Sequence, residues 1–283
     1  MSQHDTIQRF IIERLNLRGE IIRLHDTYRA VSERHVYPEE VRKTLGEGLA
    51  AVALLSATLK FEGSIILQIE SDGAINLLVV QSDHQFQLRG LAQWQPELLS
   101  LTDSHILGKG RLAITITPKQ GERYQGIVNL TNGGLADSLE TYFRQSEQLA
   151  TCLCLWSEDE TVTGMLLQLM PHNTGESAEM VWAHYTQMMK AISSHEFNQF
   201  TNQEIIQKLF YAEDVCLYDA EKVAFHCGCS VERMERALRL WDQKEIQELL
   251  RLHKKVTVTC EFCNNQYDFD AGDVARLRGH IWN

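Results

Sequence analysis

Four of the seven cysteines stand in two close pairs near the C-terminal end of the chain, and this arrangement limits the possible folds more than any other feature. The first pair is Cys227-Gly228-Cys229, the second is Cys260-Glu261-Phe262-Cys263, and thirty residues lie between them. A tetrahedral Zn²⁺ site needs two such pairs, because each grips the ion from one side while the intervening chain brings the pairs together. The spacing therefore predicts one zinc ion bound by four thiolates, those of Cys227, Cys229, Cys260 and Cys263.

A four-thiolate site is closed to substrate, so it is structural or redox-active through its sulfurs and unsuited to hydrolysis. The last 58 residues bury little surface unaided, and structural zinc contributes about 10–16 kcal/mol of apparent binding energy in small peptides. Oxidation of the thiolates would eject the metal and remove that stabilisation. The alternatives are four unrelated buried thiols, or a histidine ligand from His226, His253 or His280.

Charge and hydropathy exclude several classes of protein. The 283 residues carry 27 basic and 38 acidic side chains, a net charge of -11, which disfavours a broad nucleic-acid-binding surface. The longest apolar stretch, residues 49–59, is too short to cross a bilayer, and the first residues lack the basic start and apolar run of a secretory signal. We therefore expect a cytoplasmic protein that binds neither nucleic acid nor membrane.

Residues 1–177 are expected to form a mixed α+β domain with a largely antiparallel sheet. Apolar residues at Ile7, Phe10, Ile11 and Leu15 have helical spacing. Pro38 opens a second helix that runs to about residue 60, and Gly46 and Gly48 within it are positions for close packing. A third helix is expected over 135–148. Strands are predicted at 64–70, 74–81, 111–117, 124–130, 150–156 and 161–170, the first two joined by an Asp72-Gly73 turn.

The remaining chain divides at residues 171–177. Helices are predicted over 178–197 and 202–211, and the segment is only moderately apolar, so it is poorly built to stand alone and could dock on another surface. Residues 226–283 are expected to form a zinc-binding unit of two helices and a hairpin. Ser230 would cap the first helix and Asp242 the second, and strands are predicted over 256–260 and 266–269.

Further segments, together with the cysteine spacing, resemble the heat shock protein 33 family of redox-regulated chaperones. They are Phe-His-Cys-Gly-Cys-Ser at 225–230, Arg-Gly-Glu at 18–20, Tyr-Gln-Gly-Ile-Val at 124–128, and Tyr-Phe-Arg-Gln-Ser-Glu-Gln at 142–148. The family usually has Gly after the last cysteine and Pro after the Ser-Glu-Gln segment, where this chain has Asn264 and Ala150. Asn suits a left-handed turn better than other non-Gly residues, so the cysteine turn should persist.

The resemblance implies an ATP-independent holdase, not an enzyme, that binds unfolding client proteins and prevents their aggregation under oxidative stress. Zinc would hold residues 226–283 folded in the reduced state, while residues 178–225, a metastable helical linker, cover an apolar surface of the N-terminal domain. Oxidation would form the disulfides Cys227–Cys229 and Cys260–Cys263, release zinc and unfold the linker. The oxidised form would be a homodimer.

Two other functions stay open from the residues alone. One is a zinc-ribbon protein that binds nucleic acid or modifies RNA, although residues 226–283 carry nine basic and nine acidic side chains and hence no net charge. The other is a thiol-disulfide oxidoreductase using Cys260 and Cys263, although no helix begins after this pair to lower a thiol pKa.

Three cysteines remain outside the zinc motif. Cys152 and Cys154 alternate with Leu153 and Leu155, so both thiols should lie on one face of a strand as ordinary half-buried residues. Cys216 is expected to pack within the linker.

Overall fold

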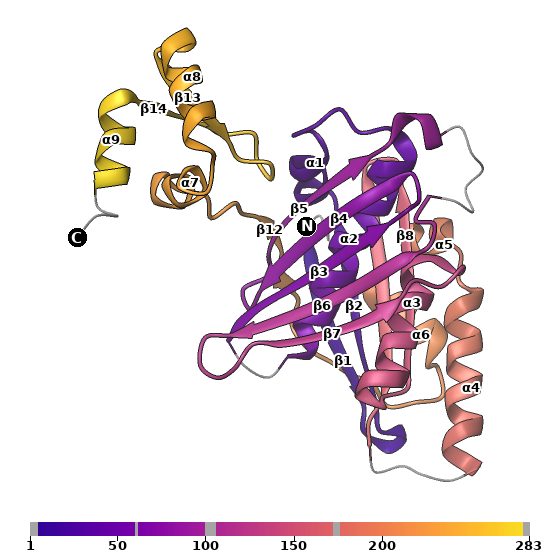
Figure 1. The fold of residues 1–283 in the computed structure, drawn as a ribbon. Helices are drawn as coiled ribbons and strands as arrows, with labels where there is room; N and C mark the ends of the chain where they lie inside the picture. The colour runs from indigo at the N-terminus through magenta and orange to yellow at the C-terminus, as the bar shows by residue number, and fades with distance from the viewer. Residues whose placement is uncertain (1–4, 60–61, 100–105, 172–175, 280–283) are drawn as a thin grey trace. The chain divides into compact units, whose positions relative to one another are not determined.

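The computed structural model describes residues 5–59, 62–99, 106–171 and 176–279 (Figure 1). The chain separates into two compact units, Met1–His226 and Cys227–Asn283. No helix within the described ranges is long and apolar enough to cross a membrane.

The first unit contains two six-stranded sheets. Sheet A has the order β10-β1-β2-β9-β8, with β11 also paired to β1, and all its pairs are antiparallel. Its strands are β1 (Thr6–Ile12), β2 (Leu17–Leu24), β8 (Thr151–Glu158), β9 (Thr161–Leu169), β10 (Cys216–Leu217) and β11 (Glu221–Lys222).

Sheet B has the order β12-β5-β4-β3-β6-β7, and only its pair β12–β5 is parallel. Its strands are β3 (Gly63–Ser71), β4 (Ile75–Asp83), β5 (Gln87–Trp94), β6 (Gly110–Pro118), β7 (Tyr124–Asn129) and β12 (Ala224–Phe225). The hairpin predicted around Asp72-Gly73 is confirmed as β3 and β4. The mixed architecture with antiparallel sheets confirms the predicted fold class.

Helix α2 (Glu39–Thr58) contacts strands of both sheets and forms the centre of the main core. A Cβ atom at Gly46 would lie 2.7 Å from Val162 Cγ2 of sheet A, and one at Gly48 would lie 3.2 Å from Leu78 Cδ2 of sheet B. The two glycines therefore allow the helix to approach both sheets, as predicted for close-packing positions. Shorter elements complete this part: α1 (Asp26–Ser32), α3 (Gly134–Tyr142), a π-helical turn (Phe143–Glu147) and 3₁₀ turns η1 (Glu13–Leu15) and η2 (Pro96–Leu98).

Three further helices cover the opposite face of sheet A: α4 (Glu176–Ala191), α5 (Ser194–Gln199) and α6 (Asn202–Leu209) (Figure 1). Sheet and helices share a second apolar cluster. It includes Phe10, Ile12, Leu17, Ile21, Cys152, Met165 and Leu167 from the sheet, Tyr185, Met189, Phe197, Ile205, Ile206 and Leu209 from the helices, and Ile192 from the turn between α4 and α5. Sheet A is thus buried on both faces.

The helix predicted within residues 1–17 is wrong, because β1 and the start of β2 occupy this segment. Ile7 packs in the core around α2, whereas Phe10 and Ile12 pack in the cluster under α4–α6. Burial on both faces removes the alternation of apolar and polar residues that marks a half-buried strand. The remaining apolar spacing then imitates a helix.

The helix predicted over 178–197 is two helices. α4 ends at Ala191, and the side chain of Ser193 accepts a hydrogen bond from the Glu196 amide at the start of α5. α1 and β5 were not predicted, and the helix expected over 135–148 ends in the π-helical turn after Tyr142.

The second unit contains α7 (Val231–Leu238), α8 (Gln243–His253), β13 (Lys255–Thr259), β14 (Gln266–Asp270) and α9 (Ala271–Gly279). Both predicted caps are confirmed: Ser230 accepts from the amide of Arg233, and Asp242 from those of Lys244 and Glu245. The predicted hairpin is present as β13 and β14, whereas α9 was not predicted. A small core holds these elements together, formed by Leu238, Ile246, Val256, Val258, Phe269, Val274 and Leu277.

Glu20 is a buried carboxyl group of β2 without a hydrogen-bond partner in the described part of the chain. Arg9 lies alongside, but its Nε is 3.5 Å from Glu20 Oε1, which is long for a hydrogen bond. Burial outweighs the attraction of the nearby arginines and raises the pKa of Glu20 to about 7. The native carboxyl group therefore keeps its proton over a pH range in which the unfolded chain has lost it.

We predict that Glu20→Gln removes a pH-dependent loss of stability. The contribution of Glu20 to the unfolding free energy should fall as the pH rises from about 4.5 to about 7, because only the unfolded state ionises readily there. Across this window the unfolding free energy of the variant should therefore rise relative to that of the original chain, by roughly 1.4 kcal/mol per unit of pKa shift. Urea unfolding at a series of pH values measures this gain, with the exposed Glu39→Gln as control. A difference that stays constant with pH would contradict the prediction.

Candidate metal centre

The turn between β13 and β14 positions Cys260 and Cys263. The amide of Cys260 donates to the Asn265 carbonyl at 2.9 Å, and the amides of Cys263 and Asn264 donate to the Cys260 carbonyl at 3.3 and 2.8 Å. Asn264 has a φ of 59°, which confirms the left-handed turn expected at this position. This turn directs both sulfurs toward the segment that precedes α7.

Cys227 and Cys229 lie on that extended segment, immediately before the Ser230 cap of α7. The Sγ atoms of Cys227 and Cys260 are 3.7 Å apart, and those of Cys229 and Cys263 are 3.4 Å apart. All four Sγ atoms lie within 4.8 Å of one another, and all seven cysteines of the chain are free thiols. A tetrahedron with Zn–S bonds of about 2.3 Å has edges of about 3.8 Å, so the four sulfurs fit a single ion of this kind.

The charge that the thiols can carry is limited by their proximity. Burial raises the pKa of Cys229, but hydrogen bonds from the Tyr267 hydroxyl, at 3.1 Å, and from neighbouring thiols outweigh it and leave the pKa at about 7. Burial raises the pKa of Cys260 and Cys263. The cluster thus loses one proton readily and resists losing more, because adjacent thiolates repel. A bound divalent cation would offset that repulsion, and thiolate donors favour a soft one.

Within the described ranges, the group of residues able to hold a metal consists of the four cysteines alone. His226 and His253 do not join it, and His280 lies outside the described residues. The structure thus brings together the four thiols that the sequence spacing groups, and that they bind zinc stays a prediction.

The other three cysteines lie apart from this centre. Cys152 and Cys154 lie on the same face of β8, as predicted, and pack in the cluster under α4–α6. The packing expected for Cys216 is wrong, because its side chain is exposed on β10. β10 lies beside β1, and the neighbouring Leu217 packs against the cluster in its place.

Comparison with known proteins decides the family. A family model described as Hsp33 protein matches residues 5–270. The chain belongs to the Hsp33 protein family. It is 39% identical over 279 residues to the 33 kDa chaperonin of Photobacterium profundum, covering 97% of this chain and 95% of that protein. The 33 kDa chaperonin of Shewanella sediminis is 40% identical over 274 residues, covering 96% and 95%.

The fold is also that of a solved family structure. The crystal structure of the 33 kDa chaperonin (heat shock protein 33 homolog) of Thermotoga maritima matches with a TM-score of 0.84, covering 99% of this chain and 100% of that one. Because the two sequences are only 21% identical, this match shows the fold alone. The chain is thus a member of a chaperone family, as its resemblance to that family implies.

Sequence reasoning missed Tyr267, whose hydroxyl donates to the sulfur of Cys229. The predicted strand over 266–269 did place Tyr267 and Phe269 on one face. The register that pairs Tyr267 with Val258 and brings its hydroxyl to the cysteines could not be read from spacing.

We predict that Tyr267→Phe weakens Zn²⁺ binding about tenfold, because partners that hydrogen-bond to metal ligands typically affect affinity on this scale. Competition with a chromogenic chelator measures the affinity. Tyr218→Phe, at an exposed tyrosine of the first unit, is the matched control and should bind as the original chain does. Equal affinities for both variants would show that the hydroxyl–sulfur contact is unimportant.

Proposed function

We propose that this chain is a redox-regulated, ATP-independent holdase that binds unfolding proteins and prevents their aggregation under oxidative stress. One Zn²⁺ is held in the reduced state by Cys227, Cys229, Cys260 and Cys263. The convergence of four free thiols within 4.8 Å, in a unit with a small core, is the observation that carries the proposal.

The four sulfurs link the β13–β14 turn to the segment before α7. When bound, zinc would supply a cross-link between them and keep the thiolates deprotonated. Peroxide oxidises Cys227 with Cys229 and Cys260 with Cys263. Each pair of thiolates gives up two electrons as its disulfide forms, and one hydrogen peroxide takes up these electrons and two protons and leaves as two waters. This pairing rests on the family resemblance. Disulfide sulfurs no longer hold the ion, so the unit loses most of its stability.

The client-binding surface is the face of sheet A that α4–α6 cover. Four apolar side chains lie there, and all four are fully buried while the helices are in place: Phe10, Ile21, Met165 and Leu167. Each such side chain loses about 1.5–3 kcal/mol of burial if it is uncovered, and apolar segments of an unfolding protein can restore it. An uncovered apolar face of this kind suits promiscuous binding.

Arg23 fastens the covering helices to the sheet. Its Nε donates to Asn202 Oδ1 at 2.6 Å, and its Nη2 donates to the carbonyls of Phe197 and Phe200 at 2.9 and 2.7 Å. Among the described residues no carboxylate forms an ion pair with it, and burial lowers the pKa of Arg23 to about 10. A buried charge without a counter-ion is costly, so this attachment is specific in geometry but modest in net stability.

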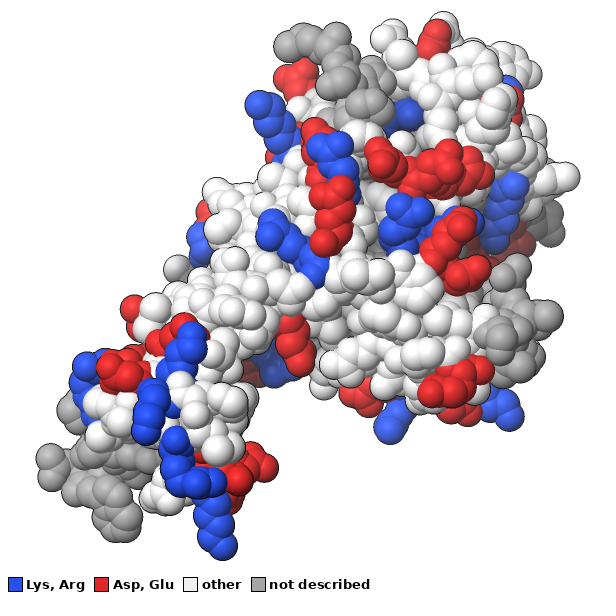
Figure 2. Space-filling model, turned by 90° about the horizontal axis from the view of Figure 1, so that it is seen from above, with Lys and Arg blue, Asp and Glu red and all other residues white. Residues whose placement is uncertain are grey.

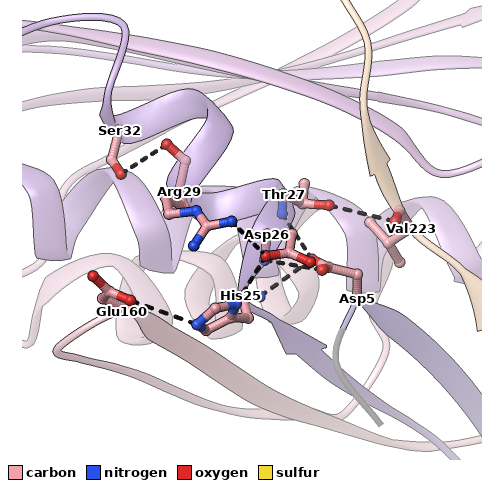
Figure 3. A network of polar contacts seen from close by, with 8 residues as sticks. All are labelled: Asp5, His25, Asp26, Thr27, Arg29, Ser32, Glu160 and Val223. Atoms are coloured by element: carbon pink, nitrogen blue, oxygen red, sulfur yellow. Dashed lines mark hydrogen bonds and ion pairs between the residues drawn. The ribbon is translucent and has the colours of Figure 1, made fainter. Parts of the chain in front are cut away.

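The chain between α6 and Cys227 connects the thiol cluster with this cover. Thr27 Oγ1 donates to the Val223 carbonyl at 3.3 Å, and the Val223 amide donates to the Asp5 carbonyl at 2.9 Å. The Asp5 carboxylate in turn accepts the amides that begin α1 (Figure 3). The backbone amide of His226 donates to the Leu88 carbonyl, and Cys227 is the next residue of the chain. Unfolding that begins at Cys227 therefore reaches first the segment that leads back to α6.

The remaining parts of the proposal concern partners and place. We expect a homodimer after oxidation, unfolded client proteins as partners, and a cytoplasmic location. On the larger unit in Figure 2, Lys and Arg side chains are interspersed with Asp and Glu, and residues 226–283 carry no net charge, so charge gives little support to the zinc-ribbon nucleic-acid alternative.

We predict that the protein suppresses aggregation only after oxidation. Light scattering from a heat-denatured client protein, with the reduced zinc-loaded chain and again after warm peroxide treatment, measures this. Equal suppression in both states would contradict the switch, and no suppression in either state would contradict the holdase function.

We predict that Arg23→Met activates the reduced protein in part. The variant leaves Asn202 and two carbonyls without their donor, and bonds to a charged donor contribute about 1.5–3 kcal/mol, so the uncovered population should rise roughly 10- to 100-fold. Arg89→Met is the matched control, because Arg89 donates to Gln81 within sheet B. Scattering assays on both reduced, zinc-loaded variants decide. An Arg23→Met variant that does not suppress client aggregation in the reduced state would contradict this role for Arg23.

A further inference from the structure

A second pair of thiols lies under the covering helices, outside the metal centre. Cys152 and Cys154 project from the same face of β8, and Cys152 is only 2% exposed. Cys154 is partly exposed, and its thiol donates a hydrogen bond to the Met189 carbonyl of α4 at 3.9 Å, a bond that is lost when the thiol ionises or is oxidised. Any change in the size or position of these sulfurs therefore acts directly on the contact between β8 and α4.

The backbone between the two cysteines is tied to the same helix. The Leu153 amide donates to Glu140 Oε1 of α3 at 2.9 Å, and Lys190 Nζ of α4 lies 3.2 Å from Glu140 Oε2. β8 is an edge strand of sheet A, paired only with β9 among the described strands. It can therefore shift at its free edge without breaking a second strand pairing, but not without disturbing Glu140.

The two thiols are unequal. The hydrogen bond from Cys152 lowers the pKa of Cys154 and outweighs burial and the Glu140 carboxylate, which both raise it, while the same thiol pair raises the pKa of Cys152. The more accessible sulfur is thus the better nucleophile, with a protonated thiol beside it. This is the arrangement of an attacking and a resolving cysteine.

We propose that Cys152 and Cys154 form a second peroxide-sensitive dithiol, whose oxidation loosens α4 from sheet A. The Cys154 thiolate attacks a peroxide oxygen and becomes a sulfenic acid as hydroxide leaves. The Cys152 sulfur then attacks that sulfur, forming the disulfide, and its proton leaves with the displaced hydroxide as water. Two thiols and one hydrogen peroxide give one disulfide and two waters.

Closing this disulfide must bend the strand. Residues two apart in a strand have Cα atoms about 6.6 Å apart, near the upper limit of about 6.8 Å for a disulfide, and their parallel Cβ atoms must close from roughly that spacing to about 3.5–4.5 Å. The resulting pucker at Leu153 would weaken its bond to Glu140 and hence the link to Lys190. Such a strained disulfide is also easily reduced, which makes the change reversible. Its effect on activation rests on the proposed holdase function, since loosening α4 lowers the oxidation needed to uncover sheet A.

Mass spectrometry tests the chemistry directly. Trypsin cleaves after Arg144 and Lys190, and the peptide 145–190 contains Cys152 and Cys154 as its only cysteines. After peroxide treatment and alkylation, at doses that leave zinc bound, this peptide should appear unalkylated and lighter by two hydrogen atoms. A peptide alkylated at both cysteines at every such dose would overturn the proposal, and this outcome needs no variant.

Limited trypsin digestion of the folded protein tests the structural consequence. Cleavage after Lys190 should become about tenfold faster after the same treatment, because it reports opening of α4, while cleavage after Lys43 of α2 should not change. Cys152→Ala/Cys154→Ala should abolish the acceleration, and Cys216→Ala, at an exposed thiol of the same unit, should keep it. Equal acceleration in the double variant, or disulfide formation without faster cleavage, would overturn the proposal. Zinc retention and client scattering in the same samples report separately on the proposed holdase function.

Discussion

Sheet A is covered by α2 on one face and by α4–α6 on the other, and the two covers differ in kind. α2 is apolar on nearly all sides and contacts both sheets, so the first unit would unfold without it. α4–α6 share an apolar cluster with sheet A, and the buried Arg23, which forms no ion pair with a carboxylate among the described residues, attaches them to it. One face of the sheet is thus permanently buried, while the other can be uncovered without loss of the main core. The holdase function that we propose requires this asymmetry, because the client surface must be hidden in one state and exposed in the other.

The apolar clusters attract their members together, whereas the members of the thiol cluster repel one another once they are ionised. Four sulfurs within 4.8 Å are compatible with full ionisation only when a cation lies among them, and the surrounding core is small. If the cluster binds zinc as proposed, the stability of the second unit depends on the chemical state of the sulfurs far more than on its apolar contacts. Its first cysteine follows directly on the strand segment that returns from α6, so a local chemical change has a short path along the chain to the cover of sheet A.

Sequence reasoning was most successful where chemistry depends on neighbours along the chain. The caps at Ser230 and Asp242 and the left-handed Asn264 are local features that the structure confirms, and the closely spaced cysteine pairs do converge in the structure. β1 was mistaken for a helix because burial on two faces removed its alternating pattern. Arg23 and Tyr267 depend on partners that only the tertiary structure and strand register bring together, so spacing gave no signal for either.

Amide hydrogen exchange tests most directly whether loss of the metal-bound thiolate state releases the cover of sheet A. The reduced, zinc-loaded chain would be compared with the oxidised, zinc-free chain. Exchange in α4–α6 should become at least about tenfold faster, while α2 and β9 keep their protection. Faster exchange confined to residues 227–279, with α4–α6 unchanged, would contradict the coupling between the thiol cluster and the client surface.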